Sequence, residues 1–401
     1  MDSGHTVSDT TTPVIVSACR TAIGKYLGGL SSLPAPKLGA IVIREAVRRA
    51  GIDAGSIDEV IMGHVVQGGS GQAPGRQAMI HAGLPGTIPA LTVNKVCGSG
   101  LKAVMLASQA IRAGDAACIV AGGMESMSTA PHYLFGMRGG VKIGDQTARD
   151  GMIMDGLWDS FGNVHMGSYA EYTAEKAGIT RQDQDAFALE SHRRAVAAIE
   201  VCHFTAEIVP VEIPGKAGPT VFKQDEGPRK DSSAEALAKL KPAFQKDGTV
   251  TAGNAPGLND GGSALVVTSL AFAKAHGLTP LAEVTAYATG GGEPKDLFFA
   301  PIVAVQNLMK KAGSAIGDYD LIEANEAFAV QALADGRALG WDWDRVNVNG
   351  GAIALGHPIG ASGARVLTTL IHAMQARKAE TGLATLCLGG GNAVALSVKA
   401  L

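Results

Sequence analysis

The chain has 401 residues, of which 46% are hydrophobic and 18% charged, so it can bury one large core or two fused ones. The formal net charge of -3 argues against nucleic acid as a partner, and no apolar run reaches the roughly 18 residues that a membrane span needs. Glycine is abundant, at 53 residues, while aromatic residues make up only 5%, which indicates tight turns and close approaches of the backbone to a ligand.

The five cysteines are widely spaced, odd in number and form no C-x-x-C pair. A disulfide framework and a metal site are therefore not expected, and reduced thiols in a cytoplasmic protein fit better. The polar residues 1–14 predict a short disordered arm with no targeting role.

In the first third of the chain, short apolar runs alternate with amphipathic segments. Strands are predicted at 14–17, 59–65, 91–96 and 117–121, and helices at 38–50, 75–81 and 98–112. This alternation predicts an α/β fold with parallel strands joined by right-handed crossovers.

Between about 126 and 256, loops, methionines and charged residues dominate, with helices near 168–177 and 181–200, which predicts an inserted subdomain. A strand at 263–269 and a helix at 271–276 follow, and the last third then repeats the outline of the first. Its strands are predicted at 281–288, 319–323, 346–348 and 384–388, and its helices at 302–312, 328–339 and 362–377. The repeat predicts two similar halves, with a single irregular α/β sheet as the alternative.

Cys97 lies where a predicted strand turns into a helix. The N–H groups and partial positive charge of a helix N-terminus favour the thiolate, and Gly98 and Gly100 let the backbone turn sharply. This arrangement is typical of a nucleophile at a strand-to-helix elbow. The alternative is a small buried residue in front of a flexible turn.

His357 lies in a glycine-rich loop, NVNGGAIALGHPIGASG (347–363). Such a loop can hold an imidazole rigidly and leave room for a substrate beside it. His357 is therefore a candidate to take the proton from Cys97 or to donate a hydrogen bond to a substrate oxygen. An incidental histidine in a turn-rich connection is the alternative.

Two further segments end predicted strands. Cys387 ends a buried strand and is followed, after Leu388, by three glycines. It is a candidate base, and the N–H groups from Gly389 onward can form an oxyanion hole or cradle a phosphate. Asn325 stands at a strand-to-helix junction as a polar anchor for a water or a carbonyl, or simply as a helix N-cap.

Taken together, several long motifs in the same order resemble the thiolase family, from about residue 13 to residue 401. They are VNKVCGSGLKAV (93–104), AGGMESMS (121–128), HMG (165–167), TAGNAPGLNDG (251–261), EANEAFA (323–329), NVNGGAIALGHPIGASGAR (347–365) and CLGGG (387–391).

The resemblance implies a role for each matched catalytic residue. Cys97 attacks the acyl thioester and carries the acyl group, while His357 activates Cys97 and helps to bind the thioester oxygen. Asn325 holds a water in that oxyanion hole, and Cys387 moves a proton at the α-carbon of the second acyl-CoA. The N–H groups of Cys97 and Gly389 bind the other thioester oxygen.

The resemblance also implies where coenzyme A binds, with Arg229 as a basic residue beside the nucleotide. Pro256 stands where bacterial acetyl-CoA acetyltransferases commonly have a Ser that contacts pantetheine. The segment 297–299, Leu-Phe-Phe, replaces Met- and Gly-rich residues near the acyl pocket, and it can either reshape the pocket or belong to the core. The matched binding positions are His165, Met166, Arg229, Ala252, Gly253, Pro256, Leu297 and Phe328.

The fold implied by the resemblance has two similar α/β halves stacked as αβαβα layers, with an inserted loop subdomain that covers coenzyme A. The N-terminal half is expected at 1–127, completed by about 258–280, the subdomain at 128–257, and the C-terminal half at 281–401. The glycine-rich loop around 127–141 resembles a tetramer-forming loop, so a homotetramer, a dimer of dimers, is expected.

The implied activity is that of an acetyl-CoA C-acetyltransferase, which joins two acetyl-CoA to acetoacetyl-CoA and free coenzyme A, and runs the reverse thiolysis, through an acyl-Cys97 intermediate. No metal or other cofactor is expected, because coenzyme A thioesters are the substrates. A degradative 3-ketoacyl-CoA thiolase of broader chain length is one alternative, and a non-catalytic thiolase-like protein that binds lipid or acyl-CoA is another.

Two further classes are disfavoured. A decarboxylating ketoacyl synthase typically has His at the position of Asn325 and lacks the second cysteine. A dinucleotide-binding oxidoreductase needs a G-x-G-x-x-G turn after an early strand, with an acidic residue about 20 positions later, and the sequence has none.

Overall fold

The computed structural model describes residues 8–215 and 218–401, and its main sheet contains eleven strands. Nine of them follow one path in the order β15-β16-β17-β14-β1-β13-β5-β3-β4, while β2 (Gly24–Lys25) and β10 (Ile208–Val209) pair at its side. In chain order the nine strands are β1 (Pro13–Thr21), β3 (Glu59–Gly63), β4 (Ala90–Val93), β5 (Cys118–Ser126), β13 (Asn259–Ser269), β14 (Ala282–Gly291), β15 (Leu321–Ala324), β16 (Thr381–Leu388) and β17 (Asn392–Ala400).

The two ends of this path repeat one pairing order. In the first half β1, β13, β5, β3 and β4 are successive neighbours, and in the second half β14, β17, β16 and β15 are. Val346 adds an isolated parallel bridge to Ile322 of β15, at the position that β4 holds beside β3. The predicted α/β class with two similar halves is therefore confirmed.

Two predictions about the strands are wrong. Only β3 with β4, β3 with β5, and β15 with β16 are parallel along the path, and the other neighbours are antiparallel. β17 must run against β16 because only the short turn 389–391 joins them. Segment 346–348 is not a strand, because Asn347 adopts a left-handed φ of 47° and turns the chain away after Val346.

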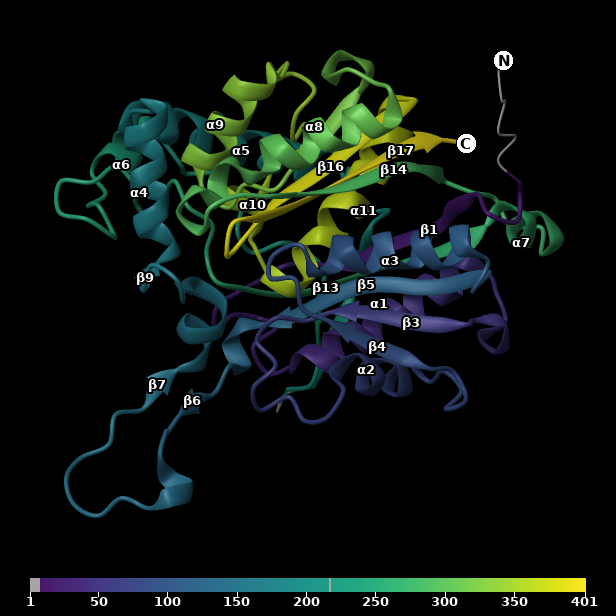
Figure 1. The fold of residues 1–401 in the computed structure, drawn as a ribbon, viewed down its shortest axis with the longest axis horizontal. Helices are drawn as coiled ribbons and strands as arrows, with labels where there is room; N and C mark the ends of the chain where they lie inside the picture. The colour runs from purple at the N-terminus through teal and green to yellow at the C-terminus, as the bar shows by residue number, and fades with distance from the viewer. Residues whose placement is uncertain (1–7, 216–217) are drawn as a thin grey trace.

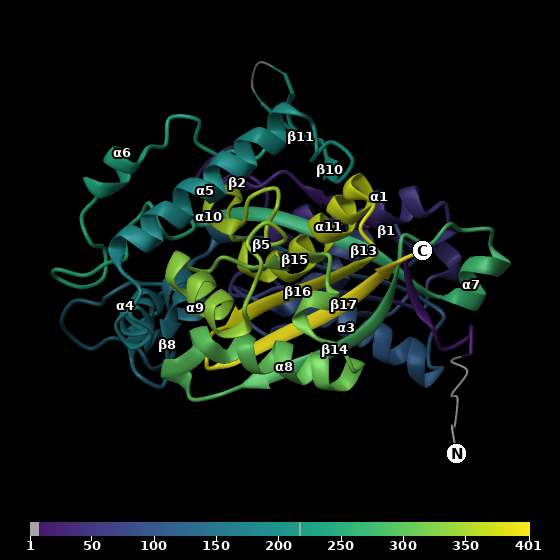
Figure 2. The ribbon, with the colours of Figure 1, turned by 90° about the horizontal axis from the view of Figure 1, so that it is seen from above.

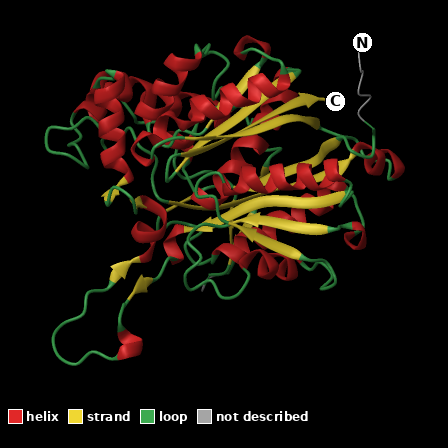
Figure 3. Cartoon of the chain, viewed as in Figure 1, coloured by secondary structure: helices red, strands yellow, loops and turns green. Residues whose placement is uncertain are grey.

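Helices cover the strands in layers (Figures 1 and 3). On one outer face, α1 (Ala35–Ala50) and α2 (Pro74–Ala82) pack on the first-half strands. On the other, α8 (Ala300–Ala312) packs on β14 and β17, with α9 (Ala329–Leu339) beside it. Between the two sets of strands lie α3 (Ser99–Ala113) and α11 (Ile359–Arg377), which contact each other.

The central layer carries the largest core. Leu101 and Val104 of α3 and Val366 and Leu370 of α11 are fully buried in one cluster with residues of both sets of strands. The first two turns of α11 are rich in glycine and alanine, so this helix can be covered on all sides. The layered order places the N-terminal ends of α3 and α11 close together. Cys97 and His357 lie just before these two helices and are therefore brought near each other.

The segment between β5 and β13 is irregular, as the change of composition predicts. It contains α4 (Met166–Ala177), α5 (Arg181–Glu200) and α6 (Ala234–Ala238), which lie together at one side of the molecule, away from the termini (Figure 2). A hairpin of β6 (His132–Tyr133) and β7 (Arg149–Asp150) extends from the body into solvent (Figure 1).

Residues 1–7 of the predicted disordered arm lie outside the described residues. From Ser8 onward the prediction is wrong, because the Ser8 carbonyl accepts hydrogen bonds from Thr11 N and Thr12 N. Asp9 also pairs with Lys274 on α7 (Leu270–Ala275). Among the helices that the structure describes, none is both long and apolar enough to cross a bilayer.

Candidate active site

Cys97 lies on a tight elbow between β4 and α3. Val96, directly before it, adopts a φ of 45°, which a β-branched residue rarely does. Three hydrogen bonds hold this backbone: Val96 N donates to Asn94 Oδ1 (3.0 Å), Lys95 N donates to Ser99 Oγ (2.9 Å), and Ser99 Oγ donates to Val96 O (2.6 Å). The predicted strand-to-helix elbow is present, and strain next to a reactive residue is typical of such turns.

His357 lies just before α11, and two of its hydrogen bonds fix its orientation. Its backbone N donates to Asn259 Oδ1 (2.8 Å), and its Nδ1 lies 2.6 Å from Ser362 Oγ. The Ser362 hydroxyl donates its single proton to Pro358 O (2.9 Å), so it must accept from Nδ1–H. The Nε2 atom is then an unprotonated acceptor, 3.5 Å from Asn325 Nδ2.

Glycines let the helices of Cys97 and His357 approach each other. A Cβ on Gly100 of α3 would lie 2.6 Å from the backbone N of Ala364 on α11, and a Cβ on Gly363 would collide with Leu101. At these two positions any side chain would collide with the facing helix. The glycines that follow each reactive residue in sequence therefore bring the two residues to one place.

Cys387 and Asn325 come from neighbouring strands. Cys387 is in β16 and Asn325 follows β15, and Ala324 of β15 pairs with Thr385 of β16. The Asn325 backbone N donates to the carbonyl of Thr385 (3.0 Å). Both side chains are buried, and Gly389 begins the glycine turn just beyond them.

One cavity of about 360 Å³ brings the reacting groups together. Its lining includes Cys97, His357, Cys387 and Gly389. Asn325 does not line this cavity, but its side-chain Nδ2 contacts Nε2 of His357, which does. Six predicted binding residues also line the cavity: His165, Met166, Ala252, Pro256, Leu297 and Phe328.

A second cavity of about 350 Å³ continues from the first. Ala252, Ala255, Gly257 and Leu258 line both. The two remaining predicted binding residues, Gly253 and the exposed Arg229, line only the second one, together with Lys25 and others. The predicted binding residues therefore follow one path, from an apolar chamber at the cysteines to a basic outer chamber.

Burial shifts the pKa of all three reacting groups, and at Cys97 it opposes the shift expected from the helix N-terminus. Burial raises the pKa of Cys97 to about 12, although the N–H groups of Gly389 and of Cys97 itself act in the opposite direction. Burial, and after it the charge of Arg365, lowers the pKa of His357 to about 3. Burial also raises the pKa of Cys387 well above its ordinary value. At Cys97 the loss of solvation therefore outweighs the helix terminus and favours the thiol over the thiolate in the resting site.

Three residues of the site were missed from the sequence. Ser362 fixes the tautomer of His357, and Asn259 fixes its backbone. Phe244 stacks on His165, with 4.8 Å between the ring centres, and lines the cavity. Ser362 had a detectable signal, since it lies five residues after His357 at the start of a helix, whereas Asn259 and Phe244 are far from their partners in sequence.

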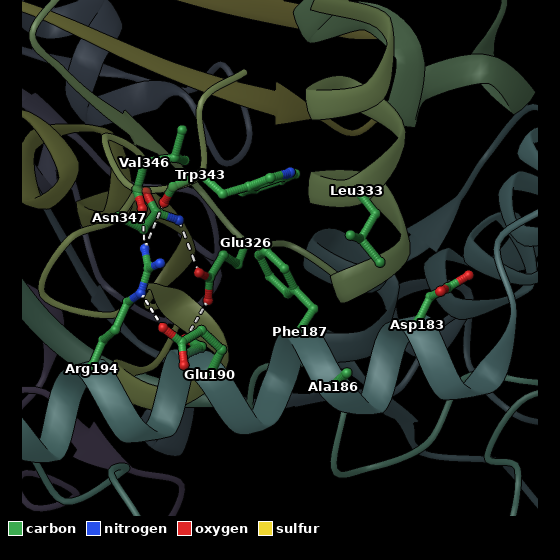
Figure 4. A pocket seen from close by; sticks show the side chains of 11 residues that line it. Asp183, Ala186, Phe187, Glu190, Arg194, Glu326, Leu333, Trp343, Val346 and Asn347 are labelled. Carbon is green, nitrogen blue, oxygen red and sulfur yellow. Dashed lines mark hydrogen bonds and ion pairs between the residues drawn. The ribbon is translucent and has the colours of Figure 1, made fainter. Parts of the chain in front are cut away.

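A separate cavity of about 260 Å³ lies between α5, α9 and the segment 343–347 (Figure 4). The Glu326 carboxylate in its wall accepts hydrogen bonds from Ser191 Oγ (2.7 Å), Asn347 Nδ2 (2.8 Å) and Ile353 N (3.0 Å). Because Glu326 follows Asn325 directly, these bonds hold the Asn325 segment against the loop that leads into α11. No predicted site residue lines this cavity, and the hydrogen bonds in its wall stabilise the position of the Asn325 segment.

In the described parts of the chain, no group of three or more His, Cys, Asp or Glu side chains is placed to hold a metal ion. The arrangement places a buried thiol at Cys387, a half-buried thiol at Cys97, one neutral imidazole and backbone N–H donors around an apolar chamber. Such a set suits covalent acyl transfer with proton transfer at a neighbouring carbon.

Comparison with known proteins gives one consistent result. The family models for the thiolase N-terminal domain and the thiolase C-terminal domain match residues 13–271 and 278–400. An acetyl-CoA acetyltransferase of Pseudomonas aeruginosa is 57% identical, over 96% of this chain and 98% of the relative. One from Escherichia coli is 56% identical, over 97% and 99%. The crystal structure of the Bacillus anthracis acetyl-CoA acetyltransferase has a TM-score of 0.96 and 43% identity, and the match covers 97% of this chain and 99% of that one.

Proposed function

The chain belongs to the thiolase family, and from this premise we propose that it is an acetyl-CoA C-acetyltransferase, which condenses two acetyl-CoA to acetoacetyl-CoA and free coenzyme A and runs the reverse thiolysis. The observation that carries the site assignment is the single cavity shared by Cys97, His357, Cys387 and Gly389. The relatives are acetyl-CoA acetyltransferases, which supports the acetyl group as the acyl group that is transferred.

In the thiolysis direction, the neutral His357 Nε2 takes the proton of Cys97 as its sulfur attacks the 3-keto carbon of acetoacetyl-CoA. The N–H groups of Cys97 and Gly389 stabilise the oxyanion that forms. The bond between C2 and C3 then breaks and leaves acetyl-Cys97 and the enolate of acetyl-CoA. The enolate oxygen lies at His357, with Asn325 behind it, and the Cys387 thiol gives its proton to the α-carbon.

In the second step, free coenzyme A transfers its thiol proton to the Cys387 thiolate and attacks the acetyl-Cys97 carbonyl. The Cys97 thiolate leaves and recovers its proton from His357. The products are two acetyl-CoA, and both cysteines and the imidazole return to their neutral forms. The condensation is the reverse sequence, and both directions are ping-pong because the acyl-Cys97 forms before the second substrate reacts.

We place the pantetheine arm in the passage between the two cavities, past Ala252 and Pro256, with His165 and Met166 in the lining of the inner cavity. The nucleotide end lies in the outer cavity, where the Arg229 guanidinium suits its phosphates. The inserted subdomain 128–257 supplies most of this passage and is proposed as the cover over coenzyme A. The reaction needs no metal or other cofactor, because the coenzyme A thioesters are its substrates.

We also propose a homotetramer in the cytoplasm, where the two reactive thiols stay reduced. The hairpin that extends from the body carries exposed apolar side chains at its tip, and Ile143 is 95% exposed. Large apolar side chains on a projecting arm favour contact with another subunit. They are Leu134, Phe135, Met137, Val141 and Ile143.

Thiolysis rates with acetoacetyl-CoA and 3-ketohexadecanoyl-CoA test the proposal. We expect much faster turnover of acetoacetyl-CoA. Preference for the long chain would identify the degradative 3-ketoacyl-CoA type instead. Absence of turnover with both substrates, in folded protein that binds coenzyme A, would favour the non-catalytic alternative.

A further inference from the structure

Phe298 belongs to the wall of the catalytic cavity and not to the distant core. It lies in the short 3₁₀ helix η5 (Pro294–Phe299) that leads into α8, and its side chain is 2% exposed. Leu297 and Phe298 both line the cavity that contains Cys97 and Cys387. The next residue, Phe299, does not line it, and the Lys176 ammonium lies 5.0 Å above the Phe299 ring.

The Phe298 ring is one end of a chain of packed rings. It meets Phe328 edge to face, with 5.2 Å between ring centres and an interplanar angle of 70°. Phe328 meets Phe244 in the same way, at 6.2 Å and 80°, and Phe244 stacks on His165. Because each ring is held by the next, Phe298 cannot turn aside without disturbing rings that also line the cavity.

This wall lies away from the openings of the cavity. Toward the outer cavity the shared lining is Ala252, Ala255, Gly257 and Leu258. A polar groove on another side shares Val96, Gly156, Met166 and Gly389 with the catalytic cavity. Phe298 belongs to neither set and packs in one cluster with Cys387, so it forms part of the closed wall beside the reacting groups.

We propose that Phe298 limits the acyl group carried by Cys97 to short chains. This inference rests on the proposed thiolase reaction. Thiolysis cleaves the bond between C2 and C3, so the part of the substrate from C3 onward stays on Cys97. Acetoacetyl-CoA leaves two carbons there, and 3-ketohexanoyl-CoA leaves four. The Phe298 ring fills part of the closed end of the cavity, where we place these two additional methylene groups.

The chain offers a matched control for this proposal. Phe298→Ala removes a ring from the cavity wall, whereas Phe299→Ala removes a neighbouring ring that lies outside it. The quantity to compare is the ratio of kcat/KM for 3-ketohexanoyl-CoA to kcat/KM for acetoacetyl-CoA. We expect Phe298→Ala to raise this ratio roughly ten- to hundred-fold and Phe299→Ala to leave it unchanged. Phe298→Leu, a smaller change in a buried position, should give an intermediate increase and guards against loss of folding.

The outcomes separate this inference from the proposed function. If the wild type cleaves acetoacetyl-CoA but neither Phe298 variant raises the ratio, Phe298 does not limit the chain and the inference is overturned, while the thiolase reaction stands. An equal rise in Phe299→Ala would also overturn it. If the wild type fails to cleave acetoacetyl-CoA, the proposed function itself fails. A wild type that already cleaves 3-ketohexanoyl-CoA as fast as acetoacetyl-CoA contradicts the inference before any variant is made.

Discussion

Ser362→Ala should reduce the reactivity of Cys97 without touching the cysteine. The Ser362 hydroxyl accepts from His357 Nδ1–H at 2.6 Å inside the protein, and this bond selects the tautomer whose Nε2 accepts the Cys97 proton. Loss of one partner of a buried hydrogen bond costs about 1–3 kcal/mol. On the tautomer equilibrium that energy is roughly a 5- to 150-fold shift. We therefore expect kcat/KM for acetoacetyl-CoA to fall by about one to two orders of magnitude.

Two assays check this prediction. Thiolysis gives kcat/KM, and the initial rate of alkylation of Cys97 by iodoacetamide reports the proton transfer to His357 without any substrate. Thr368→Val is the control, because it removes another buried hydroxyl from α11, one that lies 2.9 Å from Ser263 Oγ. Wild-type rates in Ser362→Ala, or an equal loss in Thr368→Val, would refute the tautomer argument.

Three more predictions concern ionisable groups. Since burial lowers the pKa of His357 to about 3, kcat/KM should show no acid limb near pH 6.5 in a profile from pH 5.5 to 7, and a decline with that midpoint would contradict a neutral histidine. Burial raises the pKa of Glu323 to about 8 in the folded protein, against 4.5 in the unfolded chain. The neutral carboxyl therefore contributes its full share to the stability of the fold below pH 4.5, and this share is lost as the pH rises through 8. The Tm of Glu323→Gln should thus fall less between pH 5 and pH 9 than the wild-type Tm, and parallel curves would show that Glu323 is already ionised. Arg229→Ala should raise KM for coenzyme A a few-fold at low salt and less at high salt, while Lys223→Ala, an exposed cation outside the outer cavity, should not.

Most elements of the fold are predictable from local patterns. The helix at 181–200 has the predicted bounds, and Gly51 and Gly114 end α1 and α3 as C-caps. Strand direction is not predictable in this way. β1 and β13 pair although about 240 residues separate them, and nothing in either strand specifies the direction of its partner.

The site shows the same division. Cys97, His357 and Cys387 are recognisable because glycine-rich turns follow or surround them in the sequence. The ring wall is not recognisable, because Phe244, Phe298 and Phe328 come from three segments that only the fold joins. The raised pKa of Cys97 is hidden for a related reason, since a helix terminus is visible in the sequence and the extent of burial is not.

The fate of a labelled acetyl group tests the central assignment most directly. Wild type, Cys97→Ser and Cys387→Ala are each incubated with radioactive acetyl-CoA, and both protein-bound label and acetoacetyl-CoA are measured. We expect the wild type to give both, Cys387→Ala to hold the label on Cys97 without forming acetoacetyl-CoA, and Cys97→Ser to give neither. Label on Cys97→Ser, or acetoacetyl-CoA from Cys387→Ala, would contradict the separate roles of the two thiols.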